Sequence, residues 1–348
     1  MVLFDNLYIM KLLLSIGCLF LLFSCNNKNR ENLYNGVKSV VSIDESSDMV
    51  IQGTEIALDV VIHPNRMGIG NGMLFISCFK CDTMIYTFAL PSLKLLSSFA
   101  RKGEGPDDFL FPVFCGSKNN LVSVWGLSNL RIIKQFQVTN QGDWVFKKGF
   151  QLKDNKAYNQ PYLLRDSFLF YNEFPPELSI EKVNLYDLSK TKQLKFDKDK
   201  EITESFFQMN KGDLLASDSG IAYLYYYKDQ IDFYDFDLNL IKSRSNKESP
   251  VRVNSQNYNE SLVYYVNSYA GNKFLYALKK GKPLSLLMDS SFDCMEIYDW
   301  KGNMVTEFKL NPTPDLFVVD EMNSIIYGCN YNYPDYIFRY DINDVYNH

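Results

Sequence analysis

Histidine is almost absent from this sequence. Only His63 and His348 occur among its 348 residues, and His348 ends the chain. A metal centre built from several imidazole ligands is therefore excluded, and any Ser-His-Asp or Cys-His mechanism would have to use His63, in an expected loop. Two acids facing each other across a channel can hydrolyse a glycan without histidine. The acids near expected strand ends more often cap turns, so we assign no catalytic residue; they are Asp59, Asp218, Asp289 and Asp320.

An excess of positive charge is also lacking. The chain has 36 Lys and Arg against 41 Asp and Glu, a formal net charge of −5 and a pI of about 5.3. The basic residues are scattered along the chain and form no stretch longer than a pair. Proteins that bind nucleic acid present a basic field, so we expect no DNA or RNA partner.

The seven cysteines do not form a metal-binding pattern. Cys78 and Cys81 make a CxxC, but a structural zinc site needs a second close pair, and the other cysteines beyond residue 25 are isolated. A redox CxxC normally starts a helix, whereas the residues around this pair alternate like two strands joined by a hairpin. We expect no metal and no cofactor, and in an oxidising compartment the pair can form a disulfide.

The longest apolar run lies near the N-terminus. Lys11 precedes an apolar stretch over residues 12–23 that is short for a membrane span but typical of a signal peptide. It ends in Leu-Phe-Ser-Cys at Cys25, and polar residues follow. This sequence resembles a bacterial lipobox, which implies removal of residues 1–24, acylation of Cys25, a polar tether over residues 25–35 and attachment to the periplasmic face of the outer membrane. An ordinary secretory signal or a short membrane anchor, with Cys25 incidental, is the alternative.

The rest of the chain repeats one strand pattern. Alternating apolar residues end in an aromatic residue six times, at Phe88, Phe136, Tyr186, Tyr234, Tyr298 and Tyr340. The steps between these residues are 48, 50, 48, 64 and 42, and a four-stranded propeller blade takes about 40–50 residues. We predict an all-β fold, a β-propeller of six blades of four antiparallel strands, as one domain over residues 36–348. A large sandwich or two smaller β domains are the alternatives.

Two details of this propeller can be placed in the sequence. The long fourth step indicates an insertion within residues 268–290, or an extra short blade. Ring closure normally pairs a strand from one terminus with the blade at the other. Residues 37–43 alternate well enough to complete the last blade beside residues 336–340, so we predict a ring closed by this N-terminal strand.

A glycine-rich loop carries a family resemblance. Residues 101–109 read Arg-Lys-Gly-Glu-Gly-Pro-Asp-Asp-Phe. They resemble the G-x-G-P-x-[DE]-F element of TolB-like six-bladed propeller lipoproteins, and the lipobox and the repeat are similar to those of the same family over residues 36–345. The resemblance implies the fold and an envelope location, whereas the biochemical activity of that family is largely undefined.

The same loop is the sharpest binding motif. Its backbone amides can cradle an anion, which would make Arg101, Lys102, Glu104 and Asp108 binding residues. It lacks the Lys-Ser/Thr of a P-loop. The favoured interpretation is structural: Gly103 and Gly105 permit positive φ, and Phe109 fills the core between blades.

Two tyrosine-rich runs, residues 223–227 and 331–336, fit either a sugar-stacking platform or packing between blades with a few exposed rings, and we favour packing. Together these features predict a non-catalytic binding or scaffold lipoprotein that holds a protein or another envelope partner on one propeller face. The alternative is a receptor or enzyme that acts on a small molecule or glycan in the central channel. Fold alone does not decide between the two.

Overall fold

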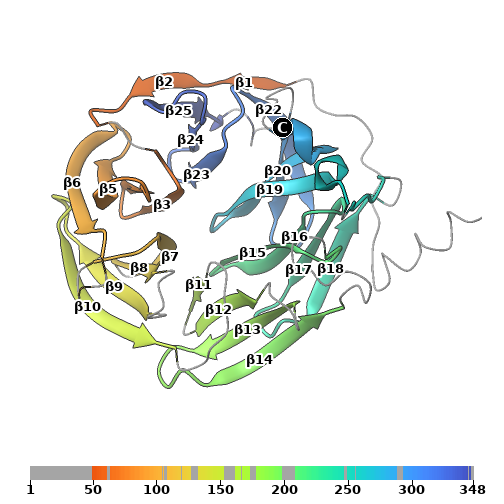
Figure 1. Cartoon of the computed structure of the whole chain (residues 1–348), viewed down its shortest axis with the longest axis horizontal. Helices are drawn as coiled ribbons and strands as arrows, with labels where there is room; N and C mark the ends of the chain where they lie inside the picture. Colours follow the sequence, from red (N-terminus) through yellow and green to blue (C-terminus); the bar gives the residue numbers. More distant parts are fainter. Residues whose placement is uncertain are drawn as a thin grey trace, which may run out of the picture.

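Six four-stranded antiparallel sheets stand around a central axis (Figure 1). The computed structural model describes residues 49–345 except 61–62, 104, 106–107, 119, 127–131, 153–160, 166, 173–177, 198–207, 247–248, 255, 288–292 and 344. The expected signal peptide, Cys25 and the tether lie outside this part. Within it, no helix is long and apolar enough to cross a membrane.

The first three blades follow one another along the chain. Blade 1 consists of β3 (Arg66–Gly70), β4 (Met73–Ser77), β5 (Thr83–Ala89) and β6 (Lys94–Arg101). Blade 2 consists of β7 (Pro112–Lys118), β8 (Leu121–Gly126), β9 (Ile132–Val138) and β10 (Trp144–Gln151). Blade 3 consists of β11 (Tyr162–Leu164), β12 (Ser167–Asn172), β13 (Leu178–Asn184) and β14 (Lys190–Phe196).

The other three blades complete the ring. Blade 4 consists of β15 (Gly212–Ser217), β16 (Gly220–Tyr225), β17 (Gln230–Tyr234) and β18 (Leu240–Ser245). Blade 5 consists of β19 (Leu262–Ala270), β20 (Phe274–Pro283), β21 (Cys294–Asp299) and β22 (Met304–Asn311). Blade 6 consists of β23 (Leu316–Asp320), β24 (Ile325–Cys329), β25 (Tyr336–Asp341) and β2 (Thr54–Ala57). The predicted fold, six blades with an N-terminal strand closing the ring, is confirmed.

The strand that closes the ring differs from the expected one. β2 pairs antiparallel with Tyr336–Arg339 of β25, so residues 54–57 take the place expected for residues 37–43, which lie outside the described part. Before it, β1 (Val50–Gln52) adds a parallel fifth strand to β22 in blade 5. The two short strands run along the outer rim (Figure 1). Sequence patterning missed β2 because Ile56 is its only large apolar residue.

The long fourth step holds no extra blade among the described residues. The added length begins before the expected insertion, in the connection from β18 to β19, which contains the short 3₁₀ helix η2 (Tyr258–Glu260). It continues in β19 and β20, which have 9 and 10 residues, and in η3 (Leu284–Leu286). Part of the expected range is therefore extended strand rather than inserted loop.

Packing between neighbouring blades explains which residues are buried. Both faces of each sheet are covered, so second strands such as β4, β16 and β24 are buried at every position. Five of the six repeat aromatics are buried. Tyr186 is the exception: it lies in the turn after β13 and is 79% exposed, so the repeat placed it wrongly in the core of blade 3.

The propeller has two distinct faces. Because neighbouring strands in a blade are antiparallel, the turns between first and second strands and between third and fourth strands leave the ring at one end. We call this end the exit face, because the innermost strands end there. The turns between second and third strands and the connections between blades lie at the opposite end, the entry face. The loop of residues 101–109 connects blades 1 and 2 and therefore belongs to the entry face.

Candidate functional site

The innermost strands β3, β7, β11, β15, β19 and β23 surround a channel of about 800 Å³. This volume falls in the range of about 300–1,000 Å³ that is typical of small-molecule sites. Its lining is mixed, and Met67, Ile69 and Leu316 are among the apolar residues that contribute to it. Charged and polar side chains are gathered at its two mouths.

Acids at the exit mouth hold neighbouring blades together. The carboxylate of Glu321 in blade 6 accepts hydrogen bonds from the backbone N–H groups of residues 272–274 in blade 5 and from the hydroxyl of Tyr276. Asp218 of blade 4 accepts a 3.0 Å bond from the backbone N–H of Arg165 in blade 3 and lies 3.7 Å from Lys118 Nζ. Both carboxylates are thus engaged in latches between blades.

Of the other candidate acids, one caps a turn, one is exposed away from the channel, and one lies outside the described residues. Asp320 accepts bonds from the backbone N–H groups of Met322 and Asn323, so it caps its own turn as expected. Asp59 is exposed and does not line the channel, and Asp289 lies outside the described residues. His63 is likewise exposed in the connection from β2 to β3. Within the described chain, no three His, Cys, Asp or Glu side chains are grouped to hold a metal ion.

The entry mouth combines one guanidinium group with tyrosines. Arg66, at the start of β3, and Tyr162, at the start of β11, both line the channel. Asp213 of β15 accepts a 2.8 Å bond from the hydroxyl of Tyr226. Burial raises the pKa of Tyr162 far above its usual value; the charge of Asp213 adds to this rise and that of Arg66 opposes it.

The glycine-rich loop supplies its own anion. The carboxylate of Asp108 accepts a 3.1 Å bond from the backbone N–H of Gly105, and a Cβ on Gly103 or Gly105 would lie 2.6 Å from its Oδ2 atom. Neither glycine adopts a positive φ, so close approach to Asp108, and not backbone conformation, requires glycine here. The expectation of positive φ was therefore wrong.

The rest of the loop matches the structural interpretation. Phe109 is buried in the core between blades 1 and 2, as predicted. Lys134 of β9 donates to the carbonyl oxygens of Gly105 and Asp108 and lies over the Phe109 ring. Arg101 and Lys102 are exposed beside it, and Glu104 lies outside the described residues.

The CxxC pair forms a disulfide. Cys78 and Cys81 are joined in the turn between β4 and β5, in the expected hairpin. Cys115 and Cys329 are free and buried, and burial raises the pKa of both thiols far above the usual value. Such thiols are poor nucleophiles, so neither has the properties of a catalytic cysteine.

The two tyrosine runs have opposite environments. Tyr223, Tyr225 and Tyr227 are buried, as the packing interpretation predicts. In the second run, Tyr331, Tyr333 and Tyr336 are 48%, 46% and 37% exposed on the entry face, so they are exposed rings of the kind that the packing interpretation allowed. They lie in the turn before β25 and at its first residue.

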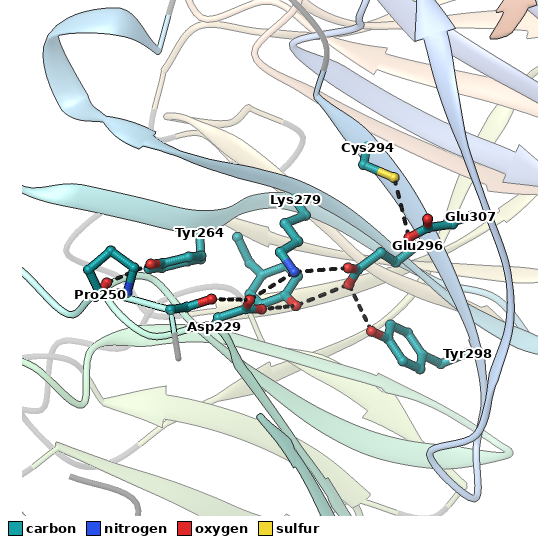
Figure 2. A network of polar contacts seen from close by, with 10 residues as sticks. Asp229, Pro250, Tyr264, Lys279, Cys294, Glu296, Tyr298 and Glu307 are labelled. Carbon is teal, nitrogen blue, oxygen red and sulfur yellow. Dashed lines mark hydrogen bonds and ion pairs between the residues drawn. The ribbon is translucent and has the colours of Figure 1, made fainter. Parts of the chain in front are cut away.

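A buried ionic network between blades 4 and 5 escaped the sequence analysis. Figure 2 shows Lys279 between Asp229 and Glu296, with Nζ 2.8 Å from Asp229 Oδ2 and 3.2 Å from Glu296 Oε1. The hydroxyl oxygen of Tyr265 lies 3.0 Å from an oxygen of each carboxylate, so its one proton is shared between them, and Tyr298 donates to Glu296. Burial raises the pKa of Glu296, although Lys279 opposes the rise. One signal in the sequence could have indicated this network: an acid stands between apolar residues of a strand. Such an acid is rarely buried without a partner.

Comparisons with known proteins agree with this architecture. A family model described as TolB-like 6-blade propeller-like matches residues 47–322. A protein from Bacteroides fragilis described as exported superposes with a TM-score of 0.58 at 10% identity, covering 86% of this chain and 97% of its own. A member of the DUF4221 family from Bacteroides vulgatus has a TM-score of 0.59 at 11% identity, covering 84% and 97%. No curated protein matches the sequence.

Proposed function

Since this chain belongs to the TolB-like 6-blade propeller-like family, we propose that it is a non-catalytic binding module of the bacterial cell envelope that recognises a protein partner through its entry face. The proposal assigns no catalytic residue. At the exit mouth, the carboxylates of Glu321 and Asp218 are bonded to the backbone of neighbouring blades. Carboxylate-based hydrolysis would need these two carboxylates free, whereas here they are occupied by contacts between blades.

The observation that carries the proposal is the exposed aromatic turn of blade 6. Tyr331, Tyr333 and Tyr336 are exposed on one short segment whose backbone is fastened by the half-buried side chain of Asp315 and the buried side chain of Asn330. Asp315 accepts a 2.7 Å bond from the N–H of Tyr331, and Asn330 accepts one from the N–H of residue 332. Rigid tyrosines lose little conformational entropy on binding and are frequent anchors of protein interfaces.

A second group of residues on the same face supports this assignment. Phe111 is 42% exposed, and its ring lies against that of Phe79 with centroids 5.2 Å apart. The predicted binding residues Arg101 and Lys102 are exposed in the same connection between blades. We propose that these two cations contact the partner and that Asp108 keeps the loop in shape, with Glu104, which lies outside the described residues, as a further binding residue.

The envelope location follows from the N-terminal sequence. We propose that Cys25 is acylated and that the protein is attached to the periplasmic face of the outer membrane. The similar Bacteroides fragilis protein described as exported and the disulfide of Cys78 with Cys81 are both consistent with an oxidising compartment. The described chain begins at β1 on the rim of blade 5, away from both channel mouths (Figure 1).

Site-specific photo-crosslinking in cells tests the binding face. A photoreactive residue replaces Tyr333 on the entry face or, as the matched control, the exposed Tyr186 on the exit face. We expect one discrete protein adduct from position 333, lost when Tyr331→Ser and Tyr336→Ser are added, and none from position 186. The same abundant envelope proteins at both positions would contradict the proposal.

Metabolic labelling with a fatty acid tests the anchor separately. We expect label on the wild type and none on Cys25→Ala, with the labelled protein in the outer-membrane fraction. Equal labelling of Cys294→Ala is the matched control. An unlabelled wild type, released in soluble form with its leader removed, would show an ordinary secretory signal.

A further inference from the structure

We infer that Arg66 marks a second binding site, inside the entry mouth of the channel, for a small molecule that carries a carboxylate or phosphate group. This site is independent of the proposed protein-binding face. Arg66 is half-buried, and it lines the channel at the first position of β3.

The guanidinium group of Arg66 is incompletely bonded within the described chain. Its one side-chain hydrogen bond is from Nη1 to the carbonyl oxygen of Asn65, at 2.8 Å, and no described carboxylate lies within ion-pair distance. A guanidinium group has five N–H donors, so most of them remain available in the channel. Half-buried cations are normally paired, because a low-dielectric setting penalises a lone charge.

The geometry of this group selects the class of ligand. The planar fork of an arginine matches two oxygens of a carboxylate or phosphate, and such charge-assisted pairs are about twice as strong as neutral hydrogen bonds. A chloride or a neutral sugar hydroxyl does not use the fork in this way. The site therefore favours an oxyanion over a neutral ligand.

One hydroxyl group from another blade shares this mouth with Arg66. Tyr162 of blade 3 lines the same channel, and Arg66 lowers its pKa against the larger raising effect of burial. The Tyr162 hydroxyl has no hydrogen-bond partner among the described residues. It is therefore available as a donor to an anion held by Arg66. Asp213, which lines the same mouth, already accepts a bond from Tyr226.

The wall behind Arg66 suits the body of such a ligand. Met67 and Ile69 follow Arg66 along β3 and line the channel beyond the mouth. An aromatic or otherwise apolar body would be buried there while its charged group stays at Arg66. The expected ligand is thus an amphiphilic small acid, not an inorganic ion alone.

Ligand-observed NMR at low salt tests this site with defined probes. The probes are benzoate and phenyl phosphate, with methyl benzoate as the uncharged match. We expect at least one of the two anions to bind, and methyl benzoate to bind at least tenfold more weakly. This comparison uses the wild-type protein and does not depend on a variant that folds. Binding of benzoate alone would identify a carboxylate site, and binding of phenyl phosphate alone a phosphate site.

Variants then locate the site. Arg66→Met should weaken binding of the anion at least tenfold, and Arg66→Lys should retain part of the affinity. Lys118→Met removes a cation from the exit mouth and should leave binding unchanged. Absence of binding by both anions, equal binding of methyl benzoate, or loss of binding in Lys118→Met with Arg66→Met unaffected would each overturn the inference. The crosslinking result at Tyr333 is unaffected by any of these outcomes.

Discussion

Lys279 of blade 5 and Asp229 of blade 4 form an ion pair across the interface between two blades, with Nζ 2.8 Å from Oδ2. Glu296 shares the same ammonium group, so one lysine balances two carboxylates that are almost completely buried. Because both carboxylates pair with the same ammonium group, the charge balance of this interface depends on that one side chain. Apolar packing also joins these two blades, as in the core shared by β17 and β20.

Replacement of this lysine tests the pairing. Lys279→Met should lower the free energy of unfolding by about 3–5 kcal/mol, because it leaves two buried carboxylates without their cation. Urea denaturation measures the change. The matched control, Lys301→Met, removes an exposed lysine in the turn between β21 and β22 and should change stability by less than about 0.5 kcal/mol. Equal shifts in both variants would contradict the prediction.

The close contact between Gly103 and Asp108 predicts that the effects of substitutions at these two residues on stability are coupled. Gly103→Ala should destabilise the protein by about 1–3 kcal/mol, because the new Cβ would lie 2.6 Å from Asp108 Oδ2. Asp108→Ala alone should lower stability by about 1 kcal/mol, since Gly105 loses its hydrogen-bond acceptor. The double variant should lose less than the sum, because removal of the carboxylate relieves the clash. Strictly additive losses in thermal or urea unfolding would refute the close contact.

The Glu321 latch predicts a graded effect at the exit mouth. Glu321→Ala should lower the free energy of unfolding by about 2 kcal/mol, because backbone N–H groups of blade 5 lose a charged acceptor. Glu321→Gln should lose less, since one side-chain oxygen can still accept. The neighbouring Met322 is 86% exposed, and Met322→Ala serves as the control with no expected change. An alanine variant as stable as this control would rule out the latch.

Buried tyrosines predict a steep loss of stability in alkali. Burial raises the pKa values of Tyr225, Tyr265 and Tyr298 well above their ordinary value of 10.0. A raised folded-state pKa gives stability that is complete below the unfolded value and is lost as the pH rises above it. Each such tyrosine should therefore cost about 1.4 kcal/mol per pH unit above about pH 10.

Parallel measurement of tyrosinate absorbance and circular dichroism checks this behaviour. Absorbance of the buried tyrosines should rise together with the loss of β structure, in one cooperative step. Tyr186→Phe, which removes an exposed ring, should leave the midpoint pH of this step unchanged. A gradual rise in absorbance that is complete while the circular dichroism remains native would count against burial of these hydroxyls.

Several features of the fold were predictable because they are local. Alternation of apolar residues and its recurrence are properties of short windows, and they led to six four-stranded blades. The burial of Phe109 followed from a loop motif of nine residues, and the hairpin position of Cys78 and Cys81 followed from the strands on either side. The repeat failed at Tyr186, where the aromatic residue follows the strand instead of ending it.

The candidate sites were less predictable. Nothing near Arg66 in the sequence indicates that it shares a channel mouth with Tyr162 of blade 3, or that Asp108 occupies the amide cradle of its own loop. The tyrosines of residues 331–336 have the spacing of a strand, and only the position of the turn before β25 exposes them.

The sequence by itself determined the class of fold, the approximate blade boundaries and the exclusion of a metal centre built from several histidines. Tertiary structure alone decided that Ile56 belongs to the closing strand, that Lys279 pairs with Asp229, and that the exposed aromatic turn and the glycine-rich loop share one face. The physical reason is that strand periodicity is encoded in neighbouring residues, whereas these relationships join segments brought together only when blades stack around the axis and the ring closes.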